Sequence, residues 1–499
     1  MNESTIYVIV CEYALIAESP ALRQLQVVLP MKILLVSPCK DPLFKKPKYL
    51  MIPQLALHLI AGLTPPEHEV RILEEEIEEI DLEEECDLVG ISCMTSNATR
   101  AYDLAREYRK RGRTVVLGGV HPTLLPDEAL QYSDAVVVGE AEGVWEQVVA
   151  DVQARKVQRV YHQPYPSLER YVSMGNRRNT KKRIFDVVPV MTTRGCPYNC
   201  EFCCVHDIFG RRIRHLPVAN VVRDIEESGG KIFIFLDDNI IGDPGYAKQL
   251  FRAIKPLKIK WVGQASVSFI KDEEMMRLAS ESGCKGLFFG LESVSQTQLN
   301  RMRKSIKEVD KIGEAVQKVK DFGIYFHASM IFGFDSDTKD TFPETLDFLE
   351  KNRISSASIN VLTPYPGTEV FRSFKEQGRL LSEDWLYYDH STVVYQPRNM
   401  TPFELQAGRL WVLKTFSQMS SLLRRLPDHL DFPLLHLAMN LGFQAACKHE
   451  LRELPDLAAR LFPVQDSKLS EQRGFPLRSL RLTDLLGRGL LKGDGSTGS

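Results

Sequence analysis

Short apolar runs alternate with longer amphipathic stretches along most of the chain. The apolar runs are rich in valine and isoleucine, which favours buried strands, and the stretches between them repeat apolar residues at helical spacing. Strands that alternate with helices predict a parallel sheet covered by helices on both faces. In the N-terminal part the expected strands are Lys32–Val36, Glu69–Leu73, Leu88–Ser92, Thr114–Leu117 and Ala135–Val138, with helices over Pro53–Leu63 and Ala98–Arg111.

The same rhythm of strand and helix appears six times between about residues 186 and 375. Six units fall short of the eight that close a full barrel, so we expect an open, partial barrel. The expected strands are Val187–Met191, Lys231–Leu236, Ile259–Ala265, Lys285–Gly290, Tyr325–Phe332 and Ala357–Leu362, and the helices between them include Val218–Ser228, Asp272–Ser282 and Val309–Phe322.

The chain has 499 residues, which is too long for a single hydrophobic core. We therefore expect an α/β protein with a doubly wound sheet over 31–153, a linker over 154–185, a partial barrel over 186–375 and a mainly helical cap over 376–462. Natural translation is expected to start at Met31, or else residues 1–30 form a poorly ordered extension, and residues 463–499 are expected to be a loosely ordered tail.

Composition narrows the class of partner. The chain is 44% hydrophobic and 26% charged, with a net charge of −2, so nothing electrostatic points to nucleic acid. It contains no apolar run of 18 residues and no signal-peptide pattern, so we expect no integral membrane segment. Its ten irregularly spaced cysteines fit a reducing compartment such as the cytoplasm, with a metal site, better than a disulfide scaffold.

Three of these cysteines, Cys196, Cys200 and Cys203, follow the first expected barrel strand at the spacing Cys-x-x-x-Cys-x-x-Cys. Three thiolates this close can hold one iron–sulfur cluster, and a four-iron cubane would then keep one iron open to a ligand that is not protein. A zinc site completed by Cys204 or His206 is the alternative, because close cysteine pairs also bind zinc.

This loop resembles the cluster loop of the radical S-adenosylmethionine (SAM) superfamily, with Phe202 in the aromatic position before the third cysteine. The resemblance implies a [4Fe–4S] cluster whose open iron binds SAM, and an electron from a reductase, ferredoxin or flavodoxin that cleaves SAM to a 5′-deoxyadenosyl radical. It also implies that later strand ends contact SAM, although the usual Gly-Gly-Glu is missing. The candidate contacts are Asp237, Asp238, Asn239, Gln264, Glu292, Ser293, Ile331 and Gly333.

The N-terminal sheet resembles the cobalamin-binding domain that precedes many radical SAM cores, through Leu117–Thr123 and Val138–Glu142. The Asp-x-His-x-x-Gly motif of methionine-synthase-like domains is absent, so a bound cobalt is expected to lack a histidine ligand from the first loop. A domain that keeps the fold without binding a corrin is the alternative, and His121 is as well explained as a loop-fixing residue. The candidate cobalamin contacts are Ser92, Gly118, Gly119, His121, Gly139 and Glu140.

Together these resemblances place the chain with the magnesium-protoporphyrin cyclase and P-methylase group. They imply cobalamin-dependent methylation of an unactivated carbon in a small-molecule or lipid-like substrate. The alternatives are a radical cyclisation, rearrangement or oxidation without methyl transfer, and a cofactor-binding sensor or carrier that does no catalysis. The aromatic and polar cluster Trp385, Tyr387, Tyr388, His390 and Tyr395 is expected either to line the substrate pocket or to pack against the barrel.

Overall fold

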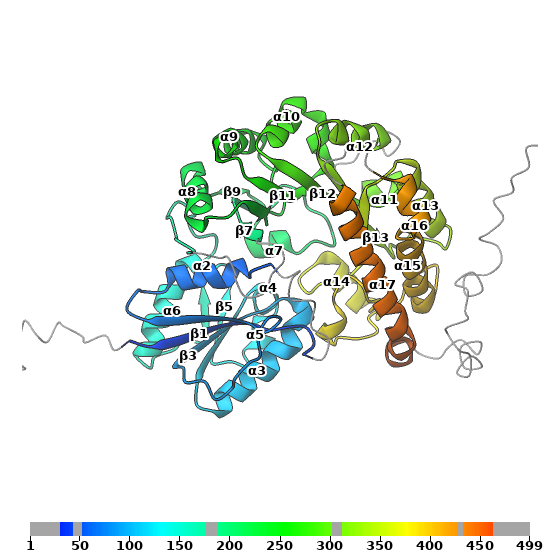
Figure 1. Ribbon diagram of the computed structural model, residues 1–499. Coiled ribbons are helices and arrows are strands. Elements are labelled where there is room, and N and C mark those ends of the chain that lie inside the picture. The colour runs from blue at the N-terminus through cyan, green and yellow to red at the C-terminus, as the bar shows by residue number, and fades with distance from the viewer. Residues whose placement is uncertain (1–29, 43–51, 176–186, 302–311, 427–432, 463–499) are drawn as a thin grey trace, which may run out of the picture.

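The computed structural model describes residues 30–42, 52–175, 187–301, 312–426 and 433–462. The expectations for residues 1–29 and 463–499 lie outside these ranges. Figure 1 shows two α/β bodies, one in blue and cyan and one in green and yellow, with orange helices packed along the second body.

The first body is a six-stranded parallel sheet in the order β2-β1-β3-β4-β5-β6. Alternate side chains of β1 enter two different cores: Leu35 packs with α2 and α6, and Leu34 and Val36 pack with α3. Helices therefore cover both faces, and the doubly wound sheet expected from the sequence is confirmed. The elements are β1 Lys32–Ser37, α2 Leu55–Leu63, β2 Glu69–Glu74, β3 Leu88–Ser92, α3 Ala98–Lys110, β4 Thr114–Gly118, α4 Val120–Leu124, α5 Pro126–Ala129, β5 Ala135–Val138, α6 Trp145–Gln153 and β6 Val160–His162.

The last strand, β6, lies within the range expected to be a linker. It is only three residues long, and only Tyr161 is buried while its two neighbours are exposed. It pairs with β5 in parallel, from Val136 opposite Val160 to Val138 opposite His162. The linker expected after residue 153 thus begins with a strand of the first sheet.

The second body is also a six-stranded parallel sheet, in the order β14-β13-β12-β11-β10-β7. Each strand pairs with the strand of this sheet that follows it along the chain, and Figure 1 shows them curving into an open arc with α8, α9, α10, α12 and α13 outside it. This is the expected partial barrel. Its elements are β7 Val187–Val190, α8 Val218–Ser228, β10 Ile232–Phe235, α9 Pro244–Ile254, β11 Lys260–Ala265, α10 Glu273–Glu281, β12 Cys284–Glu292, α11 Gln296–Arg301, α12 Ile312–Asp321, β13 Tyr325–Phe332, α13 Thr341–Lys351 and β14 Ser356–Val361.

Helices α14 (Glu369–Glu376), α15 (Pro402–Phe416), α16 (Met419–Arg424) and α17 (Pro433–Leu461) complete the chain. The start of α15 is fixed by a capping box, in which the Thr401 hydroxyl accepts from the Glu404 N–H at 3.2 Å and Glu404 Oε2 accepts from the Thr401 N–H at 2.8 Å. This helix is buried on nearly every side, between α13, β14 and α17. The expected helical region after Thr401 is therefore confirmed.

Candidate functional site

The carboxyl ends of the two sheets lie against each other. Helix α4, which follows β4 of the first sheet, contacts the short helix α7 (Val205–Phe209) of the second body. A Cβ on Gly367, which follows β14, would lie 3.0 Å from Leu124 and 3.9 Å from Asp207. Ligands of parallel sheets bind beyond the carboxyl ends of their strands, so the candidate site lies where these two edges meet.

The three cysteines of the motif lie on the connection between the two short strands β8 (Thr193–Arg194) and β9 (Arg214–His215). Cys200 is buried, Cys196 and Cys203 are half-buried, and the Cys203 N–H donates to the Cys200 carbonyl at 3.1 Å. None of the cysteines in the described ranges forms a disulfide. Three reduced thiols held on one loop fit the ligand set of an iron–sulfur cluster.

Burial raises the pKa of the Cys203 thiol to about 12 and that of the neighbouring Cys204 to about 11. A bound metal ion reverses this effect, since a coordinating thiol is deprotonated outright. Within the described part of the chain, no group of three His, Cys, Asp or Glu side chains is arranged to hold a single metal ion. The thiolates of a four-iron cubane bind separate irons, so they need not converge on one point.

Asp237, at the end of β10, fixes the strand that leads into the cysteine loop. Its Oδ1 accepts from the Thr192 N–H at 3.0 Å and from the hydroxyls of Thr192 and Thr193 at 2.8 and 2.7 Å. Burial raises the pKa of Asp237, and its second oxygen, Oδ2, has no hydrogen-bond partner within the described structure. The sequence predicts that this residue contacts SAM. The structure shows that one of its carboxylate oxygens already accepts hydrogen bonds from the strand that leads into the loop.

The two residues after Asp237 have different environments. Asp238 is half-buried and accepts a hydrogen bond from the Gly195 N–H, one residue before Cys196, while burial raises the pKa of Asp238 to about 6. Asn239 is buried, and its Oδ1 accepts from the Ser266 N–H at 3.1 Å, which joins the ends of β10 and β11. Of the three, Asp238 is therefore the best placed to meet a ligand beside the cysteine loop.

The remaining SAM candidates lie at the ends of β11, β12 and β13, which are neighbours in the sheet. Gln264 is exposed, Ile331 is half-buried, and Glu292 is buried with a φ of 65°, an uncommon conformation that clusters at functional sites. Ser293 is buried and its hydroxyl accepts from the Ser295 N–H at 3.1 Å.

Gly333, at the end of β13, has a φ of 102°, and a Cβ there would lie 2.0 Å from the Tyr395 hydroxyl. Phe202 of the cysteine loop packs edge-on against Phe334, with ring centroids 6.3 Å apart. The cysteine loop and the end of β13 are therefore in direct contact through Phe334, while glycine is required at position 333 by the close approach of Tyr395.

On the first sheet, Ser92, Gly118, Gly119 and Gly139 end the neighbouring strands β3, β4 and β5 or directly follow them. Gly119 has a φ of 96°, and a Cβ there would lie 2.7 Å from the Cys93 carbonyl oxygen. Beside it, Met94 is 60% exposed, an apolar side chain that the sequence analysis did not single out. A glycine-lined edge with an exposed apolar residue fits the approach of a large planar ligand such as a corrin.

His121 is fully buried. Its Nδ1 lies 3.3 Å from the Thr95 hydroxyl, its Nε2 lies 3.4 Å from Glu128 Oε1, and its ring packs against Trp385 of the C-terminal part at 5.1 Å. Trp385 Nε1 also donates to Glu128 Oε1 at 2.7 Å. These contacts favour the loop-fixing role for His121, and they show that Trp385 serves the interface between the two bodies.

Two sets of polar contacts were not identified from the sequence, although Glu140 and His390 were each singled out there. Arg194 and Arg214 form ion pairs with Glu140, and Arg194 also pairs with Glu142. The Arg194 and Glu140 side chains are 5% and 2% exposed, so this network is buried. Arginine next to a cysteine motif carries no recognisable signal without knowledge of what faces it.

The second set joins Tyr365 and His390. The Tyr365 hydroxyl lies 3.0 Å from His390 Nε2, and His390 has a φ of 65°. Burial lowers the pKa of His390, despite the nearby carboxylates of Asp389 and Glu292. Its unusual backbone conformation could not be read from the sequence.

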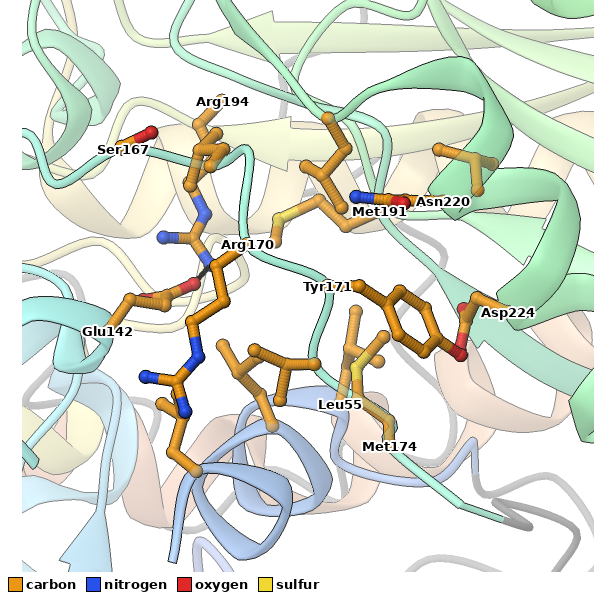
Figure 2. Close-up of a pocket in the computed structure, with 16 residues that line it drawn as sticks. Leu55, Glu142, Ser167, Arg170, Tyr171, Met174, Met191, Arg194, Asn220 and Asp224 are labelled. Carbon is orange, nitrogen blue, oxygen red and sulfur yellow. Dashed lines mark hydrogen bonds and ion pairs between the residues drawn. The ribbon is translucent and has the colours of Figure 1, made fainter. Parts of the chain in front are cut away.

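An apolar pocket lies beside the ion network, at the seam between the two bodies. Figure 2 shows Leu55 of α2 and Met174 on one side, Met191 on the other, and Glu142 with Arg194 at one end. The cysteines and the strand ends of β11 to β14 do not line it. This pocket is therefore separate from the edge where the candidate cofactor residues gather.

Two family models match the chain. Residues 190–349 match the Radical SAM superfamily, and residues 50–149 match the B12 binding domain. Together these matches imply a [4Fe–4S] cluster, SAM and cobalamin as cofactors. In the described part of the chain, no helix is long and apolar enough to span a membrane.

Among curated proteins, the chain is similar to two enzymes of Chlorobaculum tepidum. It is 29% identical to the bacteriochlorophyllide d C-8(2)-methyltransferase, over 70% of this chain and 82% of that protein. It is 30% identical to the bacteriochlorophyllide d C-12(1)-methyltransferase, over 68% of this chain and 76% of that protein. It is also 26% identical to the anaerobic magnesium-protoporphyrin IX monomethyl ester cyclase of Cereibacter sphaeroides, over 59% of this chain and 53% of that protein.

A solved structure shares the fold. The radical SAM methyltransferase TsrM from Kitasatospora setae, bound to tryptophan and a SAM analogue, superposes with a TM-score of 0.64 at 17% identity. The match covers 86% of this chain and all of that one. At this level of identity the likeness establishes the fold.

Proposed function

Because this chain belongs to the B12-binding radical SAM enzymes, we propose that it is a cobalamin-dependent methyltransferase acting on an unactivated carbon. The observation that carries the proposal is the meeting of the two strand edges, which brings the three cysteines of the motif in one body toward the glycine-lined edge of the other. The two bacteriochlorophyllide methyltransferases described above support it.

In this proposal Cys196, Cys200 and Cys203 hold the cluster and keep one iron open for SAM. Asp238 accepts hydrogen bonds from the SAM ammonium group, which its half-buried carboxylate beside Gly195 favours. The ribose and methionine parts are contacted by polar residues at the strand ends, namely Gln264, Glu292 and Ser293. Adenine is contacted by the end of β13, at Ile331 and Gly333.

Ser92, Gly118, Gly119 and Gly139 would form the cobalamin edge, together with the exposed side chain of Met94. When bound, the cluster supplies the electron for SAM cleavage and cobalamin carries the methyl group. The protein's own contribution is to position these groups and to exclude water between the two sheets. His121 and Glu140 act indirectly, since both are buried in contacts with other protein groups.

The first experiment is an ultraviolet–visible spectrum with iron and corrin quantification, on protein made anaerobically with cobalamin available. We expect a corrin spectrum and about four irons per chain, as a cubane requires. With SAM and a reductant, the loaded protein should then form 5′-deoxyadenosine, and with a substrate it should also form S-adenosylhomocysteine and a methylated product. A chlorin, a hopanoid and a cytidylyl phosphonate are suitable test substrates, because relatives of this chain are named for them.

A radical reaction without methyl transfer is the second candidate, favoured by the cyclase relative. Formation of 5′-deoxyadenosine with a modified but unmethylated substrate, and without S-adenosylhomocysteine, would support this candidate and contradict the methyltransferase. A protein that binds both cofactors and never cleaves SAM would contradict both enzymes and support a sensor or carrier.

A further inference from the structure

The cysteine loop is closed at its base by two arginines that face each other. Residues 195–213 connect β8 to β9, and in this two-stranded ladder Arg194 lies directly opposite Arg214. Like charges in directly opposed positions destabilise a strand pair. Some other part of the molecule must therefore compensate the two guanidinium groups for the loop to keep this shape.

The compensation comes from the other body. Glu140, directly after Gly139 at the end of β5, accepts hydrogen bonds from both arginines, through Arg194 Nη1 and through Arg214 Nη1 and Nη2. Glu142 accepts from Arg194 Nη2, as Figure 2 shows by the dashed line between them. Two carboxylates thus neutralise two guanidinium groups across the interface.

The network is buried at both of its central members, Arg194 and Glu140. Within the described structure the Nε atoms of both arginines and Oε2 of Glu142 have no hydrogen-bond partner, so the four groups depend strongly on one another. A buried charge that loses its partner is strongly unfavourable. Loss of either carboxylate would therefore leave a buried guanidinium group without one of its partners.

Both ends of the network are next to cofactor residues. Arg194 precedes Cys196 by two residues, and Gly195 between them has a φ of 90° and no room for a Cβ, which would lie 2.7 Å from the Arg212 carbonyl oxygen. Glu140 follows Gly139, a candidate cobalamin contact. Glu140 thus joins the β5 loop directly to the base of the cysteine loop.

We propose that Arg194 is a positioning residue, and that its ion pairs with Glu140 and Glu142 couple cobalamin binding in one body to the SAM affinity of the cluster in the other. This rests on the proposed function, because it requires that both cofactors bind. Coupling between two binding sites is reciprocal, so SAM must change the cobalamin affinity by the same factor.

The test measures the dissociation constant of SAM by anaerobic equilibrium dialysis on cluster-loaded protein, with and without saturating hydroxocobalamin. In the wild type, cobalamin is expected to tighten SAM binding by about fivefold or more, the lower end of typical coupling. In Glu140→Gln and Glu142→Gln the factor is expected to fall below about twofold. The matched control is Glu146→Gln, which removes an exposed pair between Glu146 and Arg170 on the same body and should keep the wild-type factor.

The outcomes separate this proposal from the proposed function. A wild type that binds no cobalamin contradicts the proposed function. A wild type that binds both cofactors with an unchanged SAM constant, or a Glu142→Gln protein with the full factor, overturns the coupling alone. If the variants do not fold, hydrogen exchange of residues 193–215 in the wild type decides, since the coupling requires slower exchange on adding hydroxocobalamin and unchanged exchange refutes it.

Discussion

Lys40, in the loop after β1, forms an ion pair with Asp389, in the segment after β14. The pair crosses the interface between the two bodies at the loop where methionine-synthase-like domains carry a cobalt-ligating histidine. Asp389 also accepts hydrogen bonds from the N–H groups of Ser391 and Thr392, each at 2.9 Å. In this chain the first loop is therefore used to join the two bodies.

Asp389→Asn is expected to lower the free energy of unfolding by about 1–2 kcal/mol at pH 7, a value reduced because Lys40 is partly exposed to water. Burial opposes ionisation of Asp389, but Lys40 and the Ser391 N–H outweigh it and hold its pKa below the usual range. The difference between wild type and variant should thus be constant above about pH 5 and shrink as the pH falls below about 4. Urea denaturation across this range measures it.

The control for this prediction is Glu383→Gln, which breaks an exposed pair with Lys375 in the same segment. We expect a change below about 0.5 kcal/mol there, since exposed pairs contribute little. Equal losses in the two variants would contradict an interface role for Asp389.

Alanine at Cys196, Cys200 or Cys203 is expected to abolish 5′-deoxyadenosine formation and to reduce bound iron well below the about four atoms of a cubane. Cys204→Ala is the matched control, because Cys204 is the adjacent thiol on the same loop and equally half-buried. It should retain iron and SAM cleavage. A wild type that binds one zinc and no iron, and a Cys204→Ala protein that loses this zinc, would instead indicate the zinc site considered above.

Gly119→Ala is expected to weaken hydroxocobalamin binding by about tenfold or more, because its Cβ would clash with the Cys93 backbone at the proposed corrin edge. Gly112→Ala provides the control. Gly112 also has a positive φ, 75°, and lies just before the same strand, but a Cβ there meets nothing within 4 Å. Both variants should lose about 1 kcal/mol or more of stability from backbone strain, and only the first should lose cobalamin affinity. Absorbance titration with hydroxocobalamin distinguishes them.

The sequence alone predicts those elements whose signal lies in neighbouring residues. The boundaries of β3, β5 and β13 agree with the expected ones because each is a short run of apolar residues between turn residues, and the cysteine loop is a contiguous motif. The network of Arg194 with Glu140 joins residues 54 positions apart on different bodies. No periodicity links such residues, since their pairing is decided by how the two sheets pack.

The structure also distinguishes candidate ligand contacts that the sequence could not rank, because their burial and hydrogen bonds differ. Asp237, Asp238 and Asn239 are consecutive, yet the first and third are committed to Thr192 and Ser266 while Asp238 stays accessible. Which member of a polar cluster faces a ligand depends on rotation of the chain at the strand end, which tertiary packing determines.

His327, in the middle of the barrel sheet, gives the last prediction. It is 2% exposed, with Nδ1 at 2.7 Å from the Ser356 hydroxyl and Nε2 at 2.9 Å from the Ser358 hydroxyl. Burial lowers the pKa of His327 to about 3. The unfolded chain, with an ordinary histidine pKa near 6.5, therefore binds a proton that the folded chain refuses between about pH 6.5 and pH 3.

Stability from this residue is present above about pH 6.5 and is lost as the pH falls, at about 1.4 kcal/mol per pH unit once the unfolded form is protonated. Between pH 7.5 and 5.5, the free energy of unfolding of His327→Gln is thus expected to fall by about 1.4 kcal/mol less than that of the wild type. The variant is expected to start from a lower stability at pH 7.5. Urea denaturation of the metal-free protein measures both values. His162→Gln, at an exposed histidine of β6, should keep the wild-type slope. A His327→Gln protein whose unfolding free energy changes with pH as in the wild type would contradict this prediction. It would mean that His327 is protonated in the folded wild type, so that its contacts with the two serines do not require the neutral ring.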